Sequence, residues 1–177
     1  MCSCVTAPSE PGPRPETWAT PIENEDLPNL HRVAPGLWRG AQPSADGFRA
    51  LERLGVRTVV SLRSFSRDQL PDDVELDLVE IPMHAWSQDD EDVVRFLQVA
   101  TDPARAPVFV HCLHGADRTG LACATYRVVI EGWSKEDALR EMQSGNFGFH
   151  TIWGGIPEYL RELDVDRIRA RIDRPPR

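Results

Sequence analysis

The 177-residue sequence has no surplus of basic residues and no long apolar run. Asp and Glu outnumber Lys and Arg by 28 to 20, which leaves a net charge of −8, whereas nucleic-acid-binding proteins normally carry a basic face. No apolar stretch approaches the roughly 20 residues that span a bilayer. No period repeats along the chain, which excludes solenoids and coiled coils. The sequence therefore predicts a globular protein without a nucleic-acid partner and without a membrane span.

Cysteine is scarce, and its four positions form neither a disulfide framework nor a zinc pattern. Cys2 and Cys4 are separated by one residue, whereas a zinc knuckle has about two to four between them. Cys112 and Cys123 lie close together in an apolar part of the sequence. Secreted domains usually show denser patterns, and the first 15 residues lack the apolar core of a signal peptide. These features predict a cytoplasmic protein, which we expect to be a monomer.

Proline is concentrated at the N-terminus. Six of the 15 prolines lie in residues 1–28, which contain few large apolar residues. We expect this segment to be a flexible leader, with Trp18 and Ile22 able to pin part of it to the domain. Residues 29–173 are expected to form one domain, because that length can bury a hydrophobic core of its own.

Strand and helix patterns alternate through this domain. Short strands interrupted by a turn at Pro35-Gly36 are expected within residues 30–44, and buried strands at 57–62, 76–83 and 107–112. Helices are expected at 45–55, 90–103, 119–132 and 133–142, with one or two more within 156–172. This order predicts an α/β fold with a mainly parallel sheet covered on both faces. Such sheets bind ligands at the carboxyl ends of their strands, here after Leu62, Met83 and Cys112.

The turn after the third buried strand carries the clearest chemical pattern, His111-Cys112-Leu113-His114-Gly115-Ala116-Asp117-Arg118-Thr119-Gly120. Five residues between a cysteine and an arginine can form a cup whose backbone N–H groups point inward, next to the positive end of the following helix. Gly115 permits the positive φ that such a cup requires. Arg118 can bind two anionic oxygens. A bound dianion would then lie over Cys112, whose pKa these groups lower, so that the thiolate is a nucleophile near neutral pH.

The motif His-Cys-x-x-Gly-x-x-Arg-Thr-Gly resembles the signature of the cysteine-dependent protein tyrosine and dual-specificity phosphatases. The likeness extends over about residues 30–155, through the segments LHRVAPGLWRGAQPS, GVRTVVSLR, EIPM and PVFVHC, and is greatest to the compact dual-specificity-like members. The resemblance implies a central, mainly parallel sheet of four or five strands flanked by helices. It also implies a reaction that proceeds through a phosphocysteine intermediate and needs no metal or other cofactor.

The resemblance also implies roles within the loop. Cys112 matches the nucleophile, Arg118 the phosphate-binding arginine, and Thr119 the hydroxyl that assists departure of the thiolate. His111 matches the histidine that orders the loop and tunes the cysteine pKa. The phosphate cradle corresponds to the backbone N–H groups of Leu113, His114, Gly115, Ala116, Asp117 and Arg118, with the His114 side chain at the rim. A metal site built from His111, Cys112 and His114 is disfavoured, because adjacent side chains diverge at the end of a strand.

Hydrolysis also needs a proton for the leaving oxygen, which the family usually takes from an aspartate on an upstream loop. The corresponding loop here runs from His84 to Asp92, and Ala85 occupies a position where some relatives carry the acid. We predict that Asp89 is the general acid, with Asp90 and His84 as alternatives. The acidic cluster could instead only cap the helix that follows. Arg63, after the first buried strand, could help to gather the anionic substrate or could be an ordinary surface residue.

The loop contains no lysine that would hold further phosphates, and Asp117 would repel additional anionic groups. A protein tyrosine or dual-specificity phosphatase acting on a phosphorylated protein is therefore the leading interpretation. One alternative is a phosphatase of a small metabolite or an inositol phosphate. Alternatives from another class are a phosphate-binding module and a rhodanese-like sulfurtransferase, although the latter does not predict the Arg-Thr-Gly helix start. Cys123 is interpreted as a small buried side chain rather than as a disulfide partner of Cys112.

Overall fold

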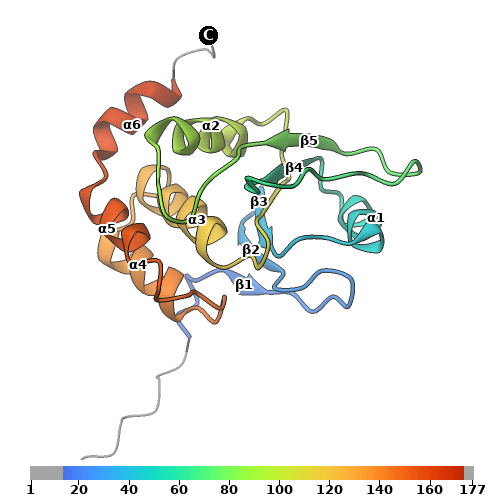
Figure 1. Ribbon diagram of the computed structural model, residues 1–177, viewed down its shortest axis with the longest axis horizontal. Helices are drawn as coiled ribbons and strands as arrows, with labels where there is room; N and C mark the ends of the chain where they lie inside the picture. The colour runs from blue at the N-terminus through green and yellow to red at the C-terminus, as the bar shows by residue number, and fades with distance from the viewer. Residues whose placement is uncertain (1–13, 174–177) are drawn as a thin grey trace, which may run out of the picture.

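A computed structural model describes residues 14–173 (Figure 1). This part of the chain contains a six-stranded sheet in the order β1-β2-β3-β6-β4-β5. The strands are β1 (Thr20–Pro21), β2 (His31–Ala34), β3 (Leu37–Gly40), β4 (Thr58–Ser61), β5 (Asp77–Glu80) and β6 (Val108–His111). The neighbours from β3 to β5 pair in parallel, whereas β1–β2 and β2–β3 are antiparallel. The predicted mainly parallel α/β fold is confirmed.

Two strand predictions need correction. The sheet has six strands rather than four or five in the described residues, because the short β1 extends its antiparallel side. The segment 76–83 was expected to be a buried strand, but β5 forms an edge of the sheet and its residues are exposed or half-buried. The central strands β4 and β6 are buried along their whole length, as expected for strands covered on both faces.

Residues 14–28 of the predicted leader pack on the domain, and Ile22, one of the two residues expected to pin it, lies against the smaller core cluster. β1 pairs with β2, and the side chains of Ala19 and Leu27 are each only 2% exposed. The Ala19 N–H donates to Glu141 Oε1 at 2.5 Å, which ties this segment to a distant helix. These contacts bury apolar side chains that the proline content of the segment obscured. Residues 1–13 of the predicted leader lie outside the described residues.

Helices cover both faces of the sheet (Figure 1). They are α1 (Ala45–Arg53), α2 (Asp90–Thr101), α3 (Asp117–Val129), α4 (Lys135–Ser144), α5 (Gly155–Glu162) and α6 (Val165–Ile172). On one face, Phe48 and Leu51 of α1 pack in a cluster with Val59 and Phe109 of the sheet. The other five helices form the larger core on the opposite face. No helix in the described range is both long and apolar enough to cross a bilayer.

α3 occupies the centre of the larger core and is buried on nearly all sides. A helix in this position is expected to be mostly apolar, and the buried charge of Arg127 in α3 is paired with Glu141 of α4 at 2.8 Å. Its N-terminus lies directly after the loop that follows β6, with Ala116 at the N-cap and no side chain capping it. The first amide groups of α3 are therefore directed toward the same end of the sheet as Cys112.

Candidate active site

Cys112 and Arg118 meet at the carboxyl ends of β6 and β4. Cys112 directly follows β6 and is 1% exposed. Arg118 lies in the first turn of α3, and its Nη1 donates to the Leu62 carbonyl oxygen, one residue beyond β4, at 3.4 Å. The strand order places β4 and β6 side by side, so the tertiary fold brings the two predicted residues to one end of the sheet.

The loop from Cys112 to Arg118 is held from its outer side. Arg39 of β3 is fully buried, and its Nη2 donates to the carbonyl oxygens of Gly115, at 2.7 Å, and Ala116, at 3.5 Å. The Gln42 N–H donates to the Leu113 carbonyl oxygen at 3.2 Å. Since these carbonyl groups turn outward, the intervening amide groups are free to face the cysteine, as in an anion-binding nest.

Gly115 is required at its position for two reasons. Its φ is +68°, in the left-handed region that residues with a side chain rarely adopt. A Cβ at this position would also lie 2.3 Å from the Gly40 carbonyl oxygen at the end of β3. The backbone of the loop therefore packs directly against the backbone of β3, and only glycine permits that approach.

These surroundings lower the pKa of Cys112. Burial opposes ionisation of the thiol, but hydrogen bonds from the Thr119 hydroxyl and backbone N–H, the Arg118 charge and the Gly115 N–H together outweigh it. The Thr119 hydroxyl is buried and has no other hydrogen-bond partner among the described residues. These surroundings of the Cys112 sulfur therefore favour the thiolate, which is the form that nucleophilic attack requires.

His111 links the loop to a chain of polar side chains behind it. Its Nδ1 lies 3.2 Å from the Cys112 carbonyl oxygen, and its Nε2 lies 2.7 Å from Asp68 Oδ2. Both partners offer hydrogen-bond acceptors, so each ring nitrogen of His111 has a contact and the ring is held between the loop and Asp68. Gln42 Nε2 donates to Asp68 Oδ1 at 2.9 Å, and Arg63 Nη1 donates to Gln42 Oε1 at 2.8 Å.

Arg63, predicted either to gather substrate or to be a surface residue, is half-buried and belongs to this chain of contacts. Its guanidinium is bound to Gln42, and it is not among the residues that line the cavity around Arg118. The burial of Asp68 alone would raise its pKa, but the His111 ring beside it, with Gln42 and Arg63, holds that pKa below its usual value. Arg63 thus supports the carboxylate that orients His111.

The predicted acid Asp89 shares a small cavity with Arg118. The cavity is lined by Met83, His84, Ser87, Gln88, Asp89, Val93, Arg118, Leu121 and Ile156. Asp89 is also the N-cap of α2, and its Oδ1 accepts from the Glu91 N–H at 2.8 Å. The capping interpretation and the placement near the site are therefore both true of the same side chain. The His84 ring lies in this cavity too and stacks on Trp86, with ring centroids 4.7 Å apart.

Asp90, the second candidate acid, is engaged elsewhere. Its carboxylate accepts from the Tyr159 hydroxyl at 2.8 Å and from Arg167 Nη2 at 2.5 Å. It does not line the cavity around Arg118. The Asp90 side chain therefore joins α2 to α5 and α6, and the register of the helix turns it away from the phosphate loop.

The Asp117 side chain, predicted to repel further anionic groups, contacts His150. It is 9% exposed and accepts from the His150 N–H at 2.8 Å and lies 2.9 Å from His150 Nδ1. His114 is exposed on the rim, as expected, with its ring tilted against that of His150. Asp117 therefore lies between two histidines at this edge of the loop.

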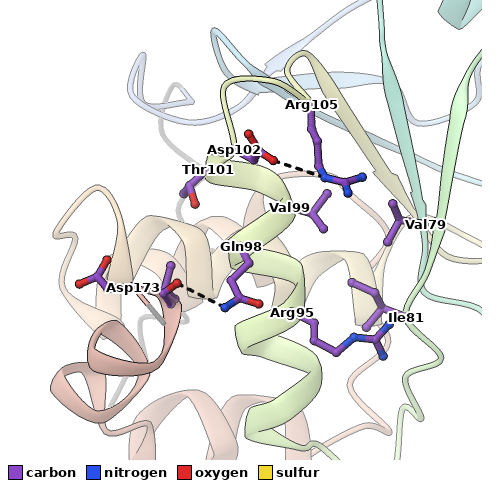
Figure 2. Close-up of a pocket in the computed structure, with 10 residues that line it drawn as sticks. Val79, Ile81, Arg95, Gln98, Val99, Thr101, Asp102, Arg105 and Asp173 are labelled. Atoms are coloured by element: carbon purple, nitrogen blue, oxygen red, sulfur yellow. Dashed lines mark hydrogen bonds and ion pairs between the residues drawn. The ribbon is translucent and has the colours of Figure 1, made fainter. Parts of the chain in front are cut away.

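A larger pocket of about 590 Å³ lies away from this site, between β5, α2 and the end of α6 (Figure 2). Its two arginines are occupied, since Arg105 pairs with Asp102 at 3.4 Å and Arg95 donates to the Glu80 carbonyl oxygen at 3.2 Å. No cysteine or histidine is among its lining residues. The chemistry predicted from the sequence therefore belongs to the smaller cavity.

Three residues that hold the site were not found from the sequence: Arg39, Gln42 and Asp68. Arg39 had a signal, since an arginine two positions after Leu37 in a strand lies on the same buried face. Asp68 and Gln42 lie in irregular segments, 43 and 26 positions apart from their partners. No local pattern marks such contacts.

The fold and this site define a cysteine-dependent phosphatase of the protein tyrosine and dual-specificity type. Residues 21–154 match the family described as DSP-PTPase phosphatase fused to NAD+ kinase. The chain belongs to this family.

Relatives and solved structures agree with this placement. The dual specificity protein phosphatase TpbA of Pseudomonas aeruginosa is 39% identical over 158 residues, which cover 89% of this chain and 72% of TpbA. The crystal structure of a cysteine-to-serine variant of TpbA in complex with phosphotyrosine superposes with a TM-score of 0.78 at 36% identity, covering 92% of this chain and all of that one. The catalytic domain of the yeast PP-IP phosphatase SIW14 shares the fold, with a TM-score of 0.69 at 21% identity, covering 81% and 91% of the two chains.

Proposed function

We propose that this phosphatase removes phosphate from phosphotyrosine in proteins, with Cys112 as its nucleophile. The observation that carries the proposal is the position of the buried Cys112 sulfur, beneath a loop whose carbonyl groups are bound from outside and beside the guanidinium of Arg118. Amide groups, the start of α3 and Arg118 together suit the three non-bridging oxygens of a phosphoryl group.

In the first step, the Cys112 thiolate attacks phosphorus and the bond from phosphorus to the ester oxygen breaks. The ester oxygen leaves with the bonding electron pair and takes a proton from Asp89, which lines the cavity beside Arg118. The products are the free alcohol and a phosphocysteine. Arg118 binds two phosphoryl oxygens while negative charge develops on them.

In the second step, water attacks the phosphocysteine and gives a proton to the Asp89 carboxylate. The bond from phosphorus to sulfur breaks, which releases inorganic phosphate and restores the thiolate. The buried Thr119 hydroxyl donates to the sulfur as its negative charge returns. His111 touches no substrate in this scheme, and it positions the loop through the Cys112 carbonyl oxygen.

Two features support phosphotyrosine as the substrate. TpbA, the relative whose structure contains phosphotyrosine, is similar to this chain over nearly its whole length. The cavity edge also carries an exposed aromatic group, since Trp86 is 63% exposed and its ring stacks against His84 and Phe65. A flat apolar surface of this kind suits an aromatic leaving group.

Turnover tests the proposal directly. The protein should hydrolyse a phosphotyrosine peptide in the presence of a chelator, and Cys112→Ser should abolish this activity while vanadate still binds to the backbone cradle. Thiosulfate-to-cyanide sulfur transfer, assayed in parallel, should be undetectable. Retention of phosphatase activity by the serine variant would contradict the assignment of Cys112.

A small or inositol phosphate is the second candidate substrate. The two exposed histidines beside the loop, His114 and His150, favour it, because imidazole rings there can donate hydrogen bonds to a further phosphate group. The ratio of kcat/KM for a phosphotyrosine peptide to that for an inositol phosphate decides between the two. The expectations that the protein acts as a cytoplasmic monomer without nucleic acid stay predictions, which fractionation and light scattering would test.

A further inference from the structure

We infer that His114, Asp117 and His150 form a binding site for a divalent transition-metal ion, such as Zn²⁺, at the rim of the phosphate loop. One ligand atom from each of these side chains lies within 4.8 Å of the other two. Among the residues that the structure describes, no other group of three such side chains is placed to hold an ion. The site differs from the disfavoured set of His111, Cys112 and His114.

Two of the three ligands are already at the required separation. His150 Nδ1 lies 2.9 Å from Asp117 Oδ2. Two ligands that each lie 2.0–2.1 Å from a tetrahedral zinc ion are about 3.3 Å apart. An ion can therefore replace the hydrogen bond between these atoms with a shift of a few tenths of an ångström.

The surrounding contacts orient this pair. The His150 N–H donates to Asp117 Oδ1 at 2.8 Å, which turns the other carboxylate oxygen toward the ring. Contacts of this kind fix a ligating carboxylate and strengthen metal binding. The Asp117 side chain is 9% exposed, whereas His150 is 49% exposed and accessible from solvent.

The third ligand is His114, whose exposed side chain can rotate toward the ion while hydrogen bonds hold its backbone. His114 is exposed, and its ring centroid lies 5.5 Å from that of His150 at an angle of 59°. Rotation of an exposed side chain costs little, so its nitrogen can approach the ion. Asn29 Nδ2 donates to the carbonyl oxygens of His114, at 3.0 Å, and Phe147, at 2.9 Å, and so joins the two segments that carry the histidines.

The donor set determines the class of ion. Two imidazole nitrogens and one carboxylate oxygen suit Zn²⁺, Co²⁺ or Ni²⁺ rather than Mg²⁺ or Ca²⁺, which prefer oxygen ligands. Three protein ligands leave a position open to solvent. The ion retains a net positive charge there, because the site supplies one carboxylate. Since His114 and Asp117 belong to the phosphate loop, we expect the bound ion to strengthen the binding of inorganic phosphate, a consequence that rests on the proposed function.

Zinc titration of the full chain tests the site once competing thiolates are removed. The parent for this experiment carries Cys2→Ser, Cys4→Ser and Cys112→Ser, and Zn²⁺ affinity is measured by competition with a chromophoric chelator. His114→Ala and His150→Ala should each weaken Zn²⁺ binding by about tenfold or more, while circular dichroism shows an unchanged fold. His84→Ala is the matched control and should leave the affinity unchanged. Equal affinity in the parent and both histidine variants would overturn the site.

Co²⁺ provides an independent readout. The parent should give visible absorption bands of a four-coordinate nitrogen and oxygen site, and His150→Ala should lose them. Phosphate affinity is then measured with and without Zn²⁺ in the parent and in His150→Ala. Zinc should tighten phosphate binding only in the parent, and an equal affinity in both conditions would overturn the coupling. Failure of the zinc-free parent to bind phosphate would instead contradict the proposed function.

Discussion

The phosphate loop (residues 112–118) and the acid loop (residues 84–92, which include the proposed acid Asp89) are both connections from a parallel strand to a helix, but the fold holds them very differently. The phosphate loop follows the central strand β6, and its carbonyl groups accept hydrogen bonds from the Arg39 side chain of β3 and from the backbone N–H of Gln42 in the turn after it. The acid loop follows the edge strand β5 and contains Trp86, which is 63% exposed. Its contacts include the short-range bond from Gln88 Nε2 to the Ala85 carbonyl oxygen at 3.0 Å and the stacking of Trp86 on Phe65, which is itself 84% exposed.

This difference separates the two halves of the reaction. The groups that we propose to bind phosphate and activate sulfur are fixed in the core before substrate arrives, which is the condition for electrostatic stabilisation of a transition state. The proposed proton donor lies on a surface loop, where substitutions cost little stability. We therefore expect changes in the phosphate loop to remove activity altogether and changes in the acid loop to alter which leaving groups are accepted.

The largest effect is expected at Cys112. Cys112→Ser should lower kcat by about 10⁵-fold or more, because a serine hydroxyl in this site is not ionised near neutral pH. Binding of vanadate should persist, since the backbone amide groups and Arg118 are unchanged. Steady-state kinetics and vanadate titration measure the two results, and a residual activity of a few per cent would exclude covalent catalysis by this residue.

Asp89→Asn should lower kcat for phosphotyrosine by about 10²–10⁴-fold. The loss should be smaller for p-nitrophenyl phosphate, whose leaving group hardly needs a proton. Asparagine caps a helix as well as aspartate does, so the melting temperature should stay nearly unchanged and the kinetic effect can be read without a loss of stability.

Asp90→Asn is the matched control for this experiment. It removes the charge that pairs with Arg167 but lies outside the cavity, so it should lower the melting temperature slightly and leave kcat unchanged. If neither variant changed kcat for phosphotyrosine, His84 or water would have to supply the proton.

Asp68→Asn should have an intermediate effect, a decrease in kcat of about tenfold with little change in KM. Without the carboxylate, His111 loses the acceptor that orients its ring and binds the Cys112 carbonyl oxygen less well. The pKa of Cys112 is lowered in the native protein, so alkylation by iodoacetate should accelerate with rising pH around a midpoint below the usual value of about 8.5. Asp68→Asn should move this midpoint upward, whereas the exposed Asp72→Asn should not.

The smallest effect is expected at Cys123. Burial raises the pKa of this thiol to about 11, so it stays protonated and unreactive where Cys112 is a thiolate. Cys123→Ala should leave kcat unchanged. Peptide mapping after brief alkylation at neutral pH should find the label on Cys112 and none on Cys123. Labelling of Cys123 at a comparable rate would contradict its placement in the closed core.

The sequence alone determined the parts of this protein that depend on neighbouring residues. Hydrophobic periodicity predicted the order of strands and helices, and the spacing from Cys112 to Arg118 predicted a phosphate loop between β6 and α3, since both signals act over a few residues. The sequence did not predict the burial of residues 14–28 against α4, because that burial depends on a partner more than 100 positions away.

Only the tertiary structure decided which side chains support the loop and which acid can reach it. Arg39, Gln42 and Asp68 come from three segments and converge on the loop after folding. The sequence ranked Asp89 above Asp90, and the structure separates them further. Asp89 is the N-cap, with an extended backbone, and lines the cavity with Arg118, whereas Asp90 is the first residue of α2 and pairs with Arg167. Contacts between distant segments are set by packing of the whole chain, which is why no local pattern contained them.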